Sequence, residues 1–151
     1  MSYSRLRFGK GAEYKIIGQM LMEGLDCYLP AADDHGVDCV IRKDDGTFIE
    51  IQIKATNKNI AFGNAGLFAA IRHKKQENYY FVFYAERLDT MWVMSSEEFL
   101  KMSSENIQGK HVGERTISFV GCRKNPLTSV REEYCKSEFN HFITKDFGRF
   151  H

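Results

Sequence analysis

Three polar side chains with complementary chemistry lie in the stretch from Gly36 to Lys54. Asp38 supplies a carboxylate, Gln52 an amide carbonyl and Lys54 an ammonium group. Gln52 and Lys54 are two residues apart, so in a strand they point to the same face, about 7 Å apart. If Asp38 shares that face, an anionic oxygen, a neutral oxygen and a cation meet there. Glu13, on a predicted helix before them, adds a second carboxylate.

This combination of groups suits hydrolysis of a phosphodiester bond. Oxygen ligands are those that Mg²⁺ prefers, so Asp38, Gln52 and Glu13 are candidate ligands for Mg²⁺ or Mn²⁺. A bound divalent cation polarises a phosphate and lowers the pKa of a bound water. Lys54 would orient or deprotonate that water, or neutralise the charge that builds up on the phosphorane oxygens. All four residues are therefore candidate catalytic residues.

The apolar spacing predicts the elements that position these groups. Residues 10–23 have the spacing of a helix that ends at Gly24. Residues 25–29 and 37–42 are predicted strands, and Asp44-Asp45-Gly46 is a predicted hairpin turn. Residues 47–55 form the clearest predicted strand, with isoleucines on one face. Its other face carries Phe48, Glu50, Gln52 and Lys54.

The second half of the chain mixes shorter predicted elements. Residues 67–76 are expected to form a short helix, and residues 79–85 and 91–94 strands. A capping box from Ser95 to Glu98 opens a further helix. Residues 116–120 are a predicted strand and residues 129–143 a predicted last helix. We expect Tyr79, Tyr80, Phe81, Phe83 and Trp92 to belong to the core rather than to stack on bases. The order of elements predicts a mixed α/β domain.

The stretch from Gly9 to Lys54 resembles the core of the PD-(D/E)XK, or restriction-endonuclease-like, nuclease superfamily. It is especially similar to members with Gln-x-Lys, such as Mrr-like, Holliday-junction-resolvase-like and some homing endonucleases. By position, Glu13 matches the helix glutamate, Asp38 the invariant metal-binding aspartate, Gln52 the second ligand and Lys54 the catalytic lysine. Two departures stand out. Val37 occupies the nominal proline position, and the neutral Gln52, in place of an acid, would hold a metal less tightly.

The resemblance implies a restriction-endonuclease-like mixed β-sheet flanked by helices. It also implies a metal-dependent endonuclease that hydrolyses phosphodiester bonds in DNA. Because one domain carries one site, cleavage of both strands calls for a homodimer or higher homo-oligomer. The alternative is a catalytically inactive relative that acts as a DNA-binding or protein-interaction module, and a third possibility is that Gln52 and Lys54 merely face solvent on an edge strand.

Length and charge narrow these possibilities. At 151 residues the chain fits one domain, residues 1–151, with the motif core at 9–85 and C-terminal strands and a helix at 86–151. The balance of 21 basic and 20 acidic residues excludes a polycation that binds nucleic acid through bulk charge. Local basic groups remain candidates for binding phosphates, although each could equally be a solvated surface: Arg5, Arg7, Lys10, Lys58, Arg72, Lys74 and Lys75.

Other features concern the setting of the protein. No apolar run approaches the roughly 18 residues that span a bilayer, and no signal-peptide pattern follows the N-terminus. We therefore expect a cytoplasmic protein with four free cysteines. Glu50 is either an outer-shell acid or a solvated carboxylate. The loop with Asp33, Asp34 and His35 either touches metal or DNA or is a plain turn.

Overall fold

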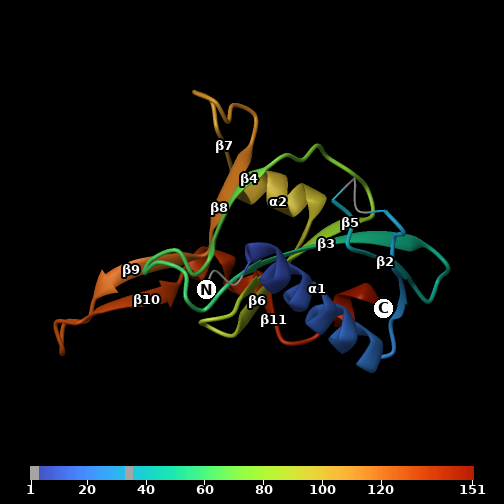
Figure 1. Cartoon of the computed structure of the whole chain (residues 1–151), viewed down its shortest axis with the longest axis horizontal. Coiled ribbons are helices and arrows are strands. Elements are labelled where there is room, and N and C mark those ends of the chain that lie inside the picture. The colour runs from blue at the N-terminus through green and yellow to red at the C-terminus, as the bar shows by residue number, and fades with distance from the viewer. Residues whose placement is uncertain (1–3, 33–35) are drawn as a thin grey trace.

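The computed structural model describes residues 4–32 and 36–151, so Asp33, Asp34 and His35 lie outside the described residues. A six-stranded mixed sheet forms the centre, in the order β1-β2-β3-β5-β6-β11 (Figure 1). Neighbours β3 and β5 are parallel, and the other neighbouring pairs are antiparallel. The strands are β1 (Asp26–Tyr28), β2 (Cys39–Arg42), β3 (Phe48–Thr56), β5 (Tyr79–Ala85), β6 (Thr90–Ser95) and β11 (Ile143–Thr144).

Helix α1 (Arg5–Met22) covers one face of this sheet. Its first turn is capped by Ser4, whose side chain accepts a hydrogen bond from the Arg7 N–H at 3.1 Å. Of the apolar residues at helical spacing, Ala12, Ile16, Ile17 and Met20 are buried, whereas Leu21 is 54% exposed. The buried side packs against the isoleucine face of β3 in one core cluster: Ile16, Ile17, Met20, Ile49, Ile51 and Ile53.

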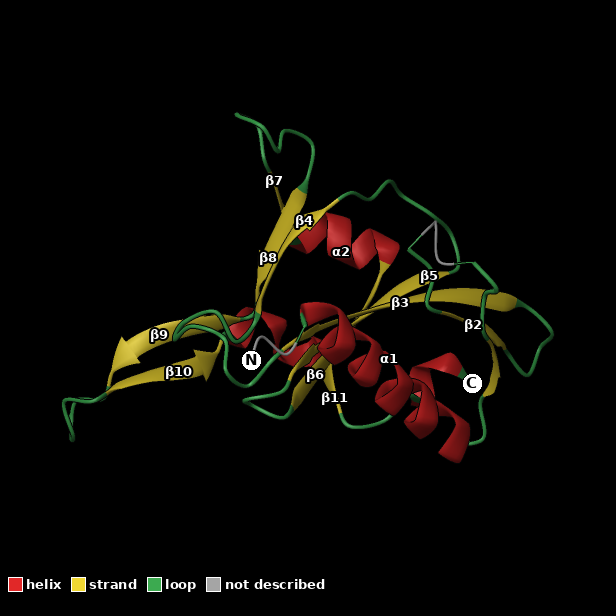
Figure 2. Ribbon diagram, viewed as in Figure 1, coloured by secondary structure: helices red, strands yellow, loops and turns green. Residues whose placement is uncertain are grey.

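A second core lies on the opposite face of the sheet. Helix α2 (Ser96–Met102), the 3-10 helix η1 (Ser137–Phe142) and a three-stranded sheet supply it. In Figure 2 the ribbon of β3 passes between α1 and α2. The three-stranded sheet has the order β4-β8-β7, from Leu67–Ile71, Arg115–Ser118 and Ser104–Glu105. The predicted aromatic core is confirmed, with Phe81, Phe83 and Trp92 fully buried.

The helix predicted over residues 67–76 is wrong, because residues 67–71 form β4. Phe68 and Ile71 are buried, and β4 pairs with β8 through an irregular register. Ala70 has a φ of 58°, which a right-handed helix does not allow. The basic residues after β4, Arg72, Lys74 and Lys75, lie in an exposed loop and not on a helix.

The helix predicted over residues 129–143 is also wrong. Residues Arg131–Cys135 form β10, which pairs with β9 (Val120–Lys124) in a separate hairpin. Ser129 has a φ of 58° and donates its N–H to the Asn125 carbonyl, which closes the turn. The strand predicted over 116–120 is divided between β8 and β9. The chain ends in η1, β11 and η2 (Gly148–Phe150).

Most remaining predictions match the structure, although α1 begins at Arg5 and not at residue 10. Residues Tyr79–Ala85 form a strand with the predicted bounds, and the capping box of Ser95 and Glu98 begins α2. Gly46 in the predicted hairpin turn has a φ of +87°. All four cysteines are free. Within residues 4–32 and 36–151, no helix combines the length and apolar character needed to cross a membrane. The mixed sheet flanked by helices confirms the predicted fold class.

Candidate active site

Asp38 is the residue directly before β2, beside a part of β3 that β2 does not pair with. Its backbone N–H donates to the Ile51 carbonyl at 2.8 Å. Its carboxylate oxygen Oδ2 accepts a hydrogen bond from the Ile53 N–H at 2.6 Å. Ile53 stands between Gln52 and Lys54, so the backbone of β3 holds the Asp38 carboxylate beside the predicted Gln-x-Lys pair.

Glu13 and Asp38 line one small cavity of about 70 Å³, which lies between α1 and the start of β2. A water molecule occupies about 30 Å³ of liquid, so this space has room for roughly two waters, or for one small cation with a water. Oε2 of Glu13 also accepts from Nζ of Lys10 at 3.1 Å. The structure therefore brings together the two predicted carboxylates and places a cation beside them.

The amide of Gln52 lies apart from this cavity and faces Tyr79. The Tyr79 hydroxyl is 2.8 Å from Oε1 of Gln52 and 3.0 Å from the Gly36 carbonyl. Burial, followed by the negative charges of Asp38 and Glu50, raises the pKa of Tyr79, so its hydroxyl remains a donor. Gly36 has a φ of +69°, and a Cβ there would lie 3.1 Å from Nε2 of Gln52. Gln52 is thus held against a glycine.

Lys54 shares the Gln52 face of β3 and is half-buried. It is paired in register with Phe83 of β5, as Gln52 is with Phe81. Among the residues that the structure describes, the Lys54 side chain makes no hydrogen bond or ion pair. The predicted set is therefore divided. Two carboxylates line one cavity, whereas Gln52 and Lys54 project from the face of β3 opposite to the one that α1 covers.

These residues can provide a mixed set of oxygen ligands but no dense acidic cluster. The described part of the chain contains no group of three or more His, Cys, Asp or Glu side chains that could hold a metal. Mg²⁺ is commonly bound through one or two carboxylates and keeps several waters. Asp38 and Glu13 meet that requirement, whereas the amide oxygen of Gln52 is held by the Tyr79 hydroxyl. The donor chemistry therefore fits a hard divalent cation.

The exposed Glu50 fits the interpretation as a solvated carboxylate. Among the residues that the structure describes, its side chain makes no hydrogen bond or ion pair, and its N–H pairs with the Asn78 carbonyl. Phe48 is likewise 53% exposed, so the Gln52 face of β3 is open toward the start of the strand. The sequence pattern did not reveal that Tyr79 and Gly36 surround Gln52. Tyr79 belongs to an apolar strand, and no spacing rule links it to a polar partner.

The predicted phosphate-binding residues lie on three separate segments. Arg5 and Lys58 belong to the two segments that border one cavity of about 630 Å³: the first turns of α1 and the loop after β3. Lys10 faces Glu13, and Arg72 pairs with Glu114 at 3.3 Å while staying 74% exposed. The others are exposed side chains at the start of α1 and after β4: Arg7, Lys74 and Lys75.

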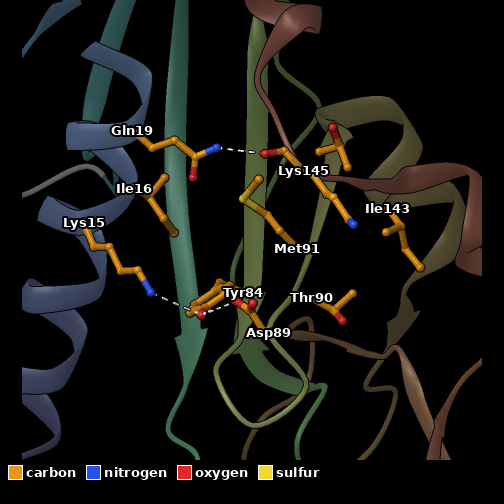
Figure 3. Close-up of a pocket in the computed structure, with 10 residues that line it drawn as sticks. Lys15, Ile16, Gln19, Tyr84, Asp89, Thr90, Met91, Ile143 and Lys145 are labelled. Carbon is orange, nitrogen blue, oxygen red and sulfur yellow. Dashed lines mark hydrogen bonds between the residues drawn. The ribbon is translucent and has the colours of Figure 1, made fainter. Parts of the chain in front are cut away.

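A further cavity, of about 390 Å³, lies on the other side of α1, between this helix and β11 (Figure 3). Lys15 donates to the Tyr84 hydroxyl at 3.4 Å, and that hydroxyl donates to Asp89 at 2.9 Å. Gln19 donates to the Lys145 carbonyl at 2.9 Å. None of the four candidate catalytic residues lines this cavity. We therefore place the candidate site at Glu13 and Asp38.

Comparisons with known proteins agree with this geometry. A sequence model described as PD-(D/E)XK endonuclease matches residues 4–120, and so extends past residue 85, where our motif core ends. No protein with a curated description matches the chain. The chain is structurally similar to a bacterial homing endonuclease, I-Ssp6803I, with a TM-score of 0.56 and 20% identity. The similarity covers 85% of this chain and 88% of that one, and it supports the restriction-endonuclease-like fold.

Proposed function

The chain belongs to the PD-(D/E)XK endonuclease family, and we propose that it is a metal-dependent endonuclease that hydrolyses phosphodiester bonds in DNA. The observation that carries this proposal is the position of Asp38. Its carboxylate lines one cavity with Glu13 and is bonded to the peptide between Gln52 and Lys54. Asp38 therefore links the cavity that contains Glu13 to the strand that carries Gln52 and Lys54.

Asp38 and Glu13, with the amide of Gln52, would hold Mg²⁺ or Mn²⁺. When bound, the cation supplies Lewis-acid polarisation of the scissile phosphate and a water of lowered pKa. The backbone hydrogen bond to Ile53 keeps Asp38 oriented for this role. The Lys54 ammonium would orient the attacking water or neutralise charge on the phosphate oxygens. Lys10, 3.1 Å from Glu13, reduces the repulsion between the site and a polyanion.

DNA is the proposed partner, and two copies of the chain would be needed to cut both strands. One domain supplies one set of Glu13, Asp38 and Lys54, which acts on one strand at a time. The two strands of a duplex run antiparallel, so a two-fold symmetric pair would present one site to each strand. The similar solved structure is described as a homing endonuclease, which supports DNA as the substrate class.

Plasmid nicking in Mg²⁺ or Mn²⁺ tests the proposal. We expect wild type to cleave and Asp38→Asn, Glu13→Gln and Lys54→Met to lose at least about a hundredfold in rate, the usual lower bound for a group that acts in the transition state. The amide introduced by Asp38→Asn keeps an oxygen acceptor for the Ile53 N–H, so this change tests the charge. Glu50→Gln, on the same strand and exposed, is the matched control and should cleave normally.

Calorimetric titration with Mn²⁺ alone separates metal binding from catalysis. Asp38→Asn should weaken Mn²⁺ binding, whereas Lys54→Met should leave it unchanged. A wild-type protein that binds DNA but cleaves none of supercoiled, linear or branched DNA would contradict the proposal and identify an inactive DNA-binding relative.

A further inference from the structure

The β9–β10 hairpin is a separate arm that extends away from the central sheet (Figures 1 and 2). Its two strands pair from Val120 opposite Cys135 to Lys124 opposite Arg131. Five residues at about 3.3 Å each give the paired part a length of roughly 17 Å, before the turn is added. An isolated two-stranded hairpin is marginally stable in water, so its base must be fixed by other contacts.

A part-buried ion pair fixes the middle of this hairpin to the turn after β5 and to the loop that follows β3. Arg87 donates from Nε to Oε1 and from Nη2 to Oε2 of Glu133, both at 2.9 Å. The Glu133 side chain is only 6% exposed. The Gly63 N–H donates to the same carboxylate at 2.8 Å. Arg87 also donates to three carbonyls of the loop: Lys58, Ile60 and Ala61.

Close packing at the start of β9 also holds the arm in place. A Cβ on Gly66 would lie 2.6 Å from the Val120 side chain, so this backbone directly contacts the start of β9. The Lys136 N–H closes the other strand by donating to the Phe119 carbonyl at 2.8 Å. Since the loop begins directly after Thr56, the arm is fixed relative to the strand that carries Lys54.

The outer part of the arm is basic. Residues 123–131 contain Arg123, Lys124 and Arg131 and no acidic residue. Lys124 and Arg131 are direct partners in the register and both exposed. Like charges directly opposite each other in an antiparallel pair destabilise a hairpin. Arg123 is neutralised by Glu132 at 2.8 Å, but the last pair of the ladder joins two cations. Arg131 also lies over the Phe62 ring, 5.3 Å from its centroid, and an external polyanion would further offset the repulsion between the two cations.

We propose that the β9–β10 hairpin lies in the major groove of duplex DNA and positions that duplex relative to the active site. This inference rests on the proposed function and adds the element that holds the substrate. The major groove of B-DNA is about 12 Å wide and admits a two-stranded ribbon. Lys124 and Arg131 would contact phosphates at the groove edges. Thr128 and the 93% exposed Leu127 at the tip would face the bases, where an apolar side chain can contact a thymine methyl group.

Fluorescence anisotropy with a labelled 30-base-pair duplex of random sequence, in EDTA, tests this proposal without cleavage. The test variant is Lys124→Glu/Arg131→Glu, and the control is Lys101→Glu/Lys110→Glu, which makes the same charge change at exposed sites on α2 and in the loop 106–114. Each phosphate contact contributes about 0.9 to the slope of log K against log salt. We expect the test variant to bind at least about tenfold more weakly, with a slope lower by about 1.8, and the control to bind like wild type.

Equal DNA binding by wild type and the test variant would overturn the inference, as would a wild type that does not bind duplex DNA. A test variant that changes only the oligomeric state would also overturn it and assign the arm to self-association. The neutral variant Lys124→Gln/Arg131→Gln decides the matter if the reversed pair folds poorly. Because metal is absent, binding that depends on the arm would support this inference even if wild type never cleaves.

Discussion

The ion pair between Arg87 and Glu133 offers a quantitative test of how the arm is attached to the domain. Arg87→Met removes both hydrogen bonds to a carboxylate that is 6% exposed, and also those to three loop carbonyls. Removing one partner of a fully buried pair leaves an uncompensated charge and costs about 3–5 kcal/mol, which is the upper bound here because Arg87 is 27% exposed. Whole domains are stable by only about 5–15 kcal/mol. We therefore expect this single change to lower the free energy of unfolding by a large fraction.

The double variant Arg87→Met/Glu133→Leu separates the pair from its surroundings. Replacing both residues leaves no unpaired charge. The double variant should therefore lose less unfolding free energy than the two single variants together, by at least about 2 kcal/mol. Arg123→Met is the matched control on the same hairpin. Arg123 and Glu132 are 61% and 36% exposed, and an exposed pair contributes at most about 1 kcal/mol.

Urea unfolding, followed by the fluorescence of the single, fully buried Trp92, measures these free energies. Circular dichroism in the same titrations checks that fluorescence and secondary structure are lost together. The coupling would be refuted if the costs of the two single changes summed to the cost of the double variant within about 0.5 kcal/mol, because independent sites are additive in that way. A cost for Arg87→Met no larger than that for Arg123→Met would show that the base of the arm is held by packing alone.

Acid stability and the glycine beside Gln52 provide two further predictions. Burial alone would raise the pKa of Glu133, but hydrogen bonds from Arg87 and Gly63 outweigh it and lower this pKa below the ordinary value of 4.5. The ion pair thus stabilises the fold fully above about pH 4.5, and this stabilisation is lost as the pH falls through the folded pKa. In urea titrations from pH 6 to 3, acid should therefore lower the unfolding free energy of wild type more steeply than that of Glu133→Gln. Gly36→Ala should cost about 1–2 kcal/mol at its φ of +69° and slow plasmid cleavage through Gln52. Gly46 is the matched control, because its φ is +87° and no heavy atom lies within 4 Å of an added Cβ. Gly46→Ala should lower stability by a similar amount and leave cleavage unchanged. Equal cleavage by both variants would contradict a role for the Gln52 position.

The central sheet could be predicted because its residues follow simple periodic patterns. The alternation from Phe48 to Lys54 gives both the strand and its two faces, and burial of Ile49, Ile51 and Ile53 confirms this. The apolar run Tyr79–Ala85 marks a strand covered on both sides, and the structure gives it the predicted bounds. In these segments a local pattern matches the tertiary environment, so the sequence alone is informative.

The two mistaken helices show where local patterns fail. Residues 131–135 form a strand because they pair with β9 across the turn at 125–130, and Arg87, 46 residues before Glu133, holds that hairpin against the domain. Residues 67–71 form a strand because β8, far along the sequence, pairs with them. Tertiary pairing overrides local propensity in both cases. No spacing within either segment carries information about these distant partners.

The position of Asp38 shows how the candidate site depends on where a strand begins. β2 starts to pair at Cys39, opposite Ile51, so the next N–H on that edge of β3, at Ile53, has no strand partner. A buried N–H left unpaired is costly, and the Asp38 carboxylate satisfies it at 2.6 Å. The same hydrogen bond therefore completes the sheet and orients a ligand. A substitution that removes the acceptor would disturb both, which is why Asp38→Asn reports on the charge of the site more cleanly than Asp38→Ala.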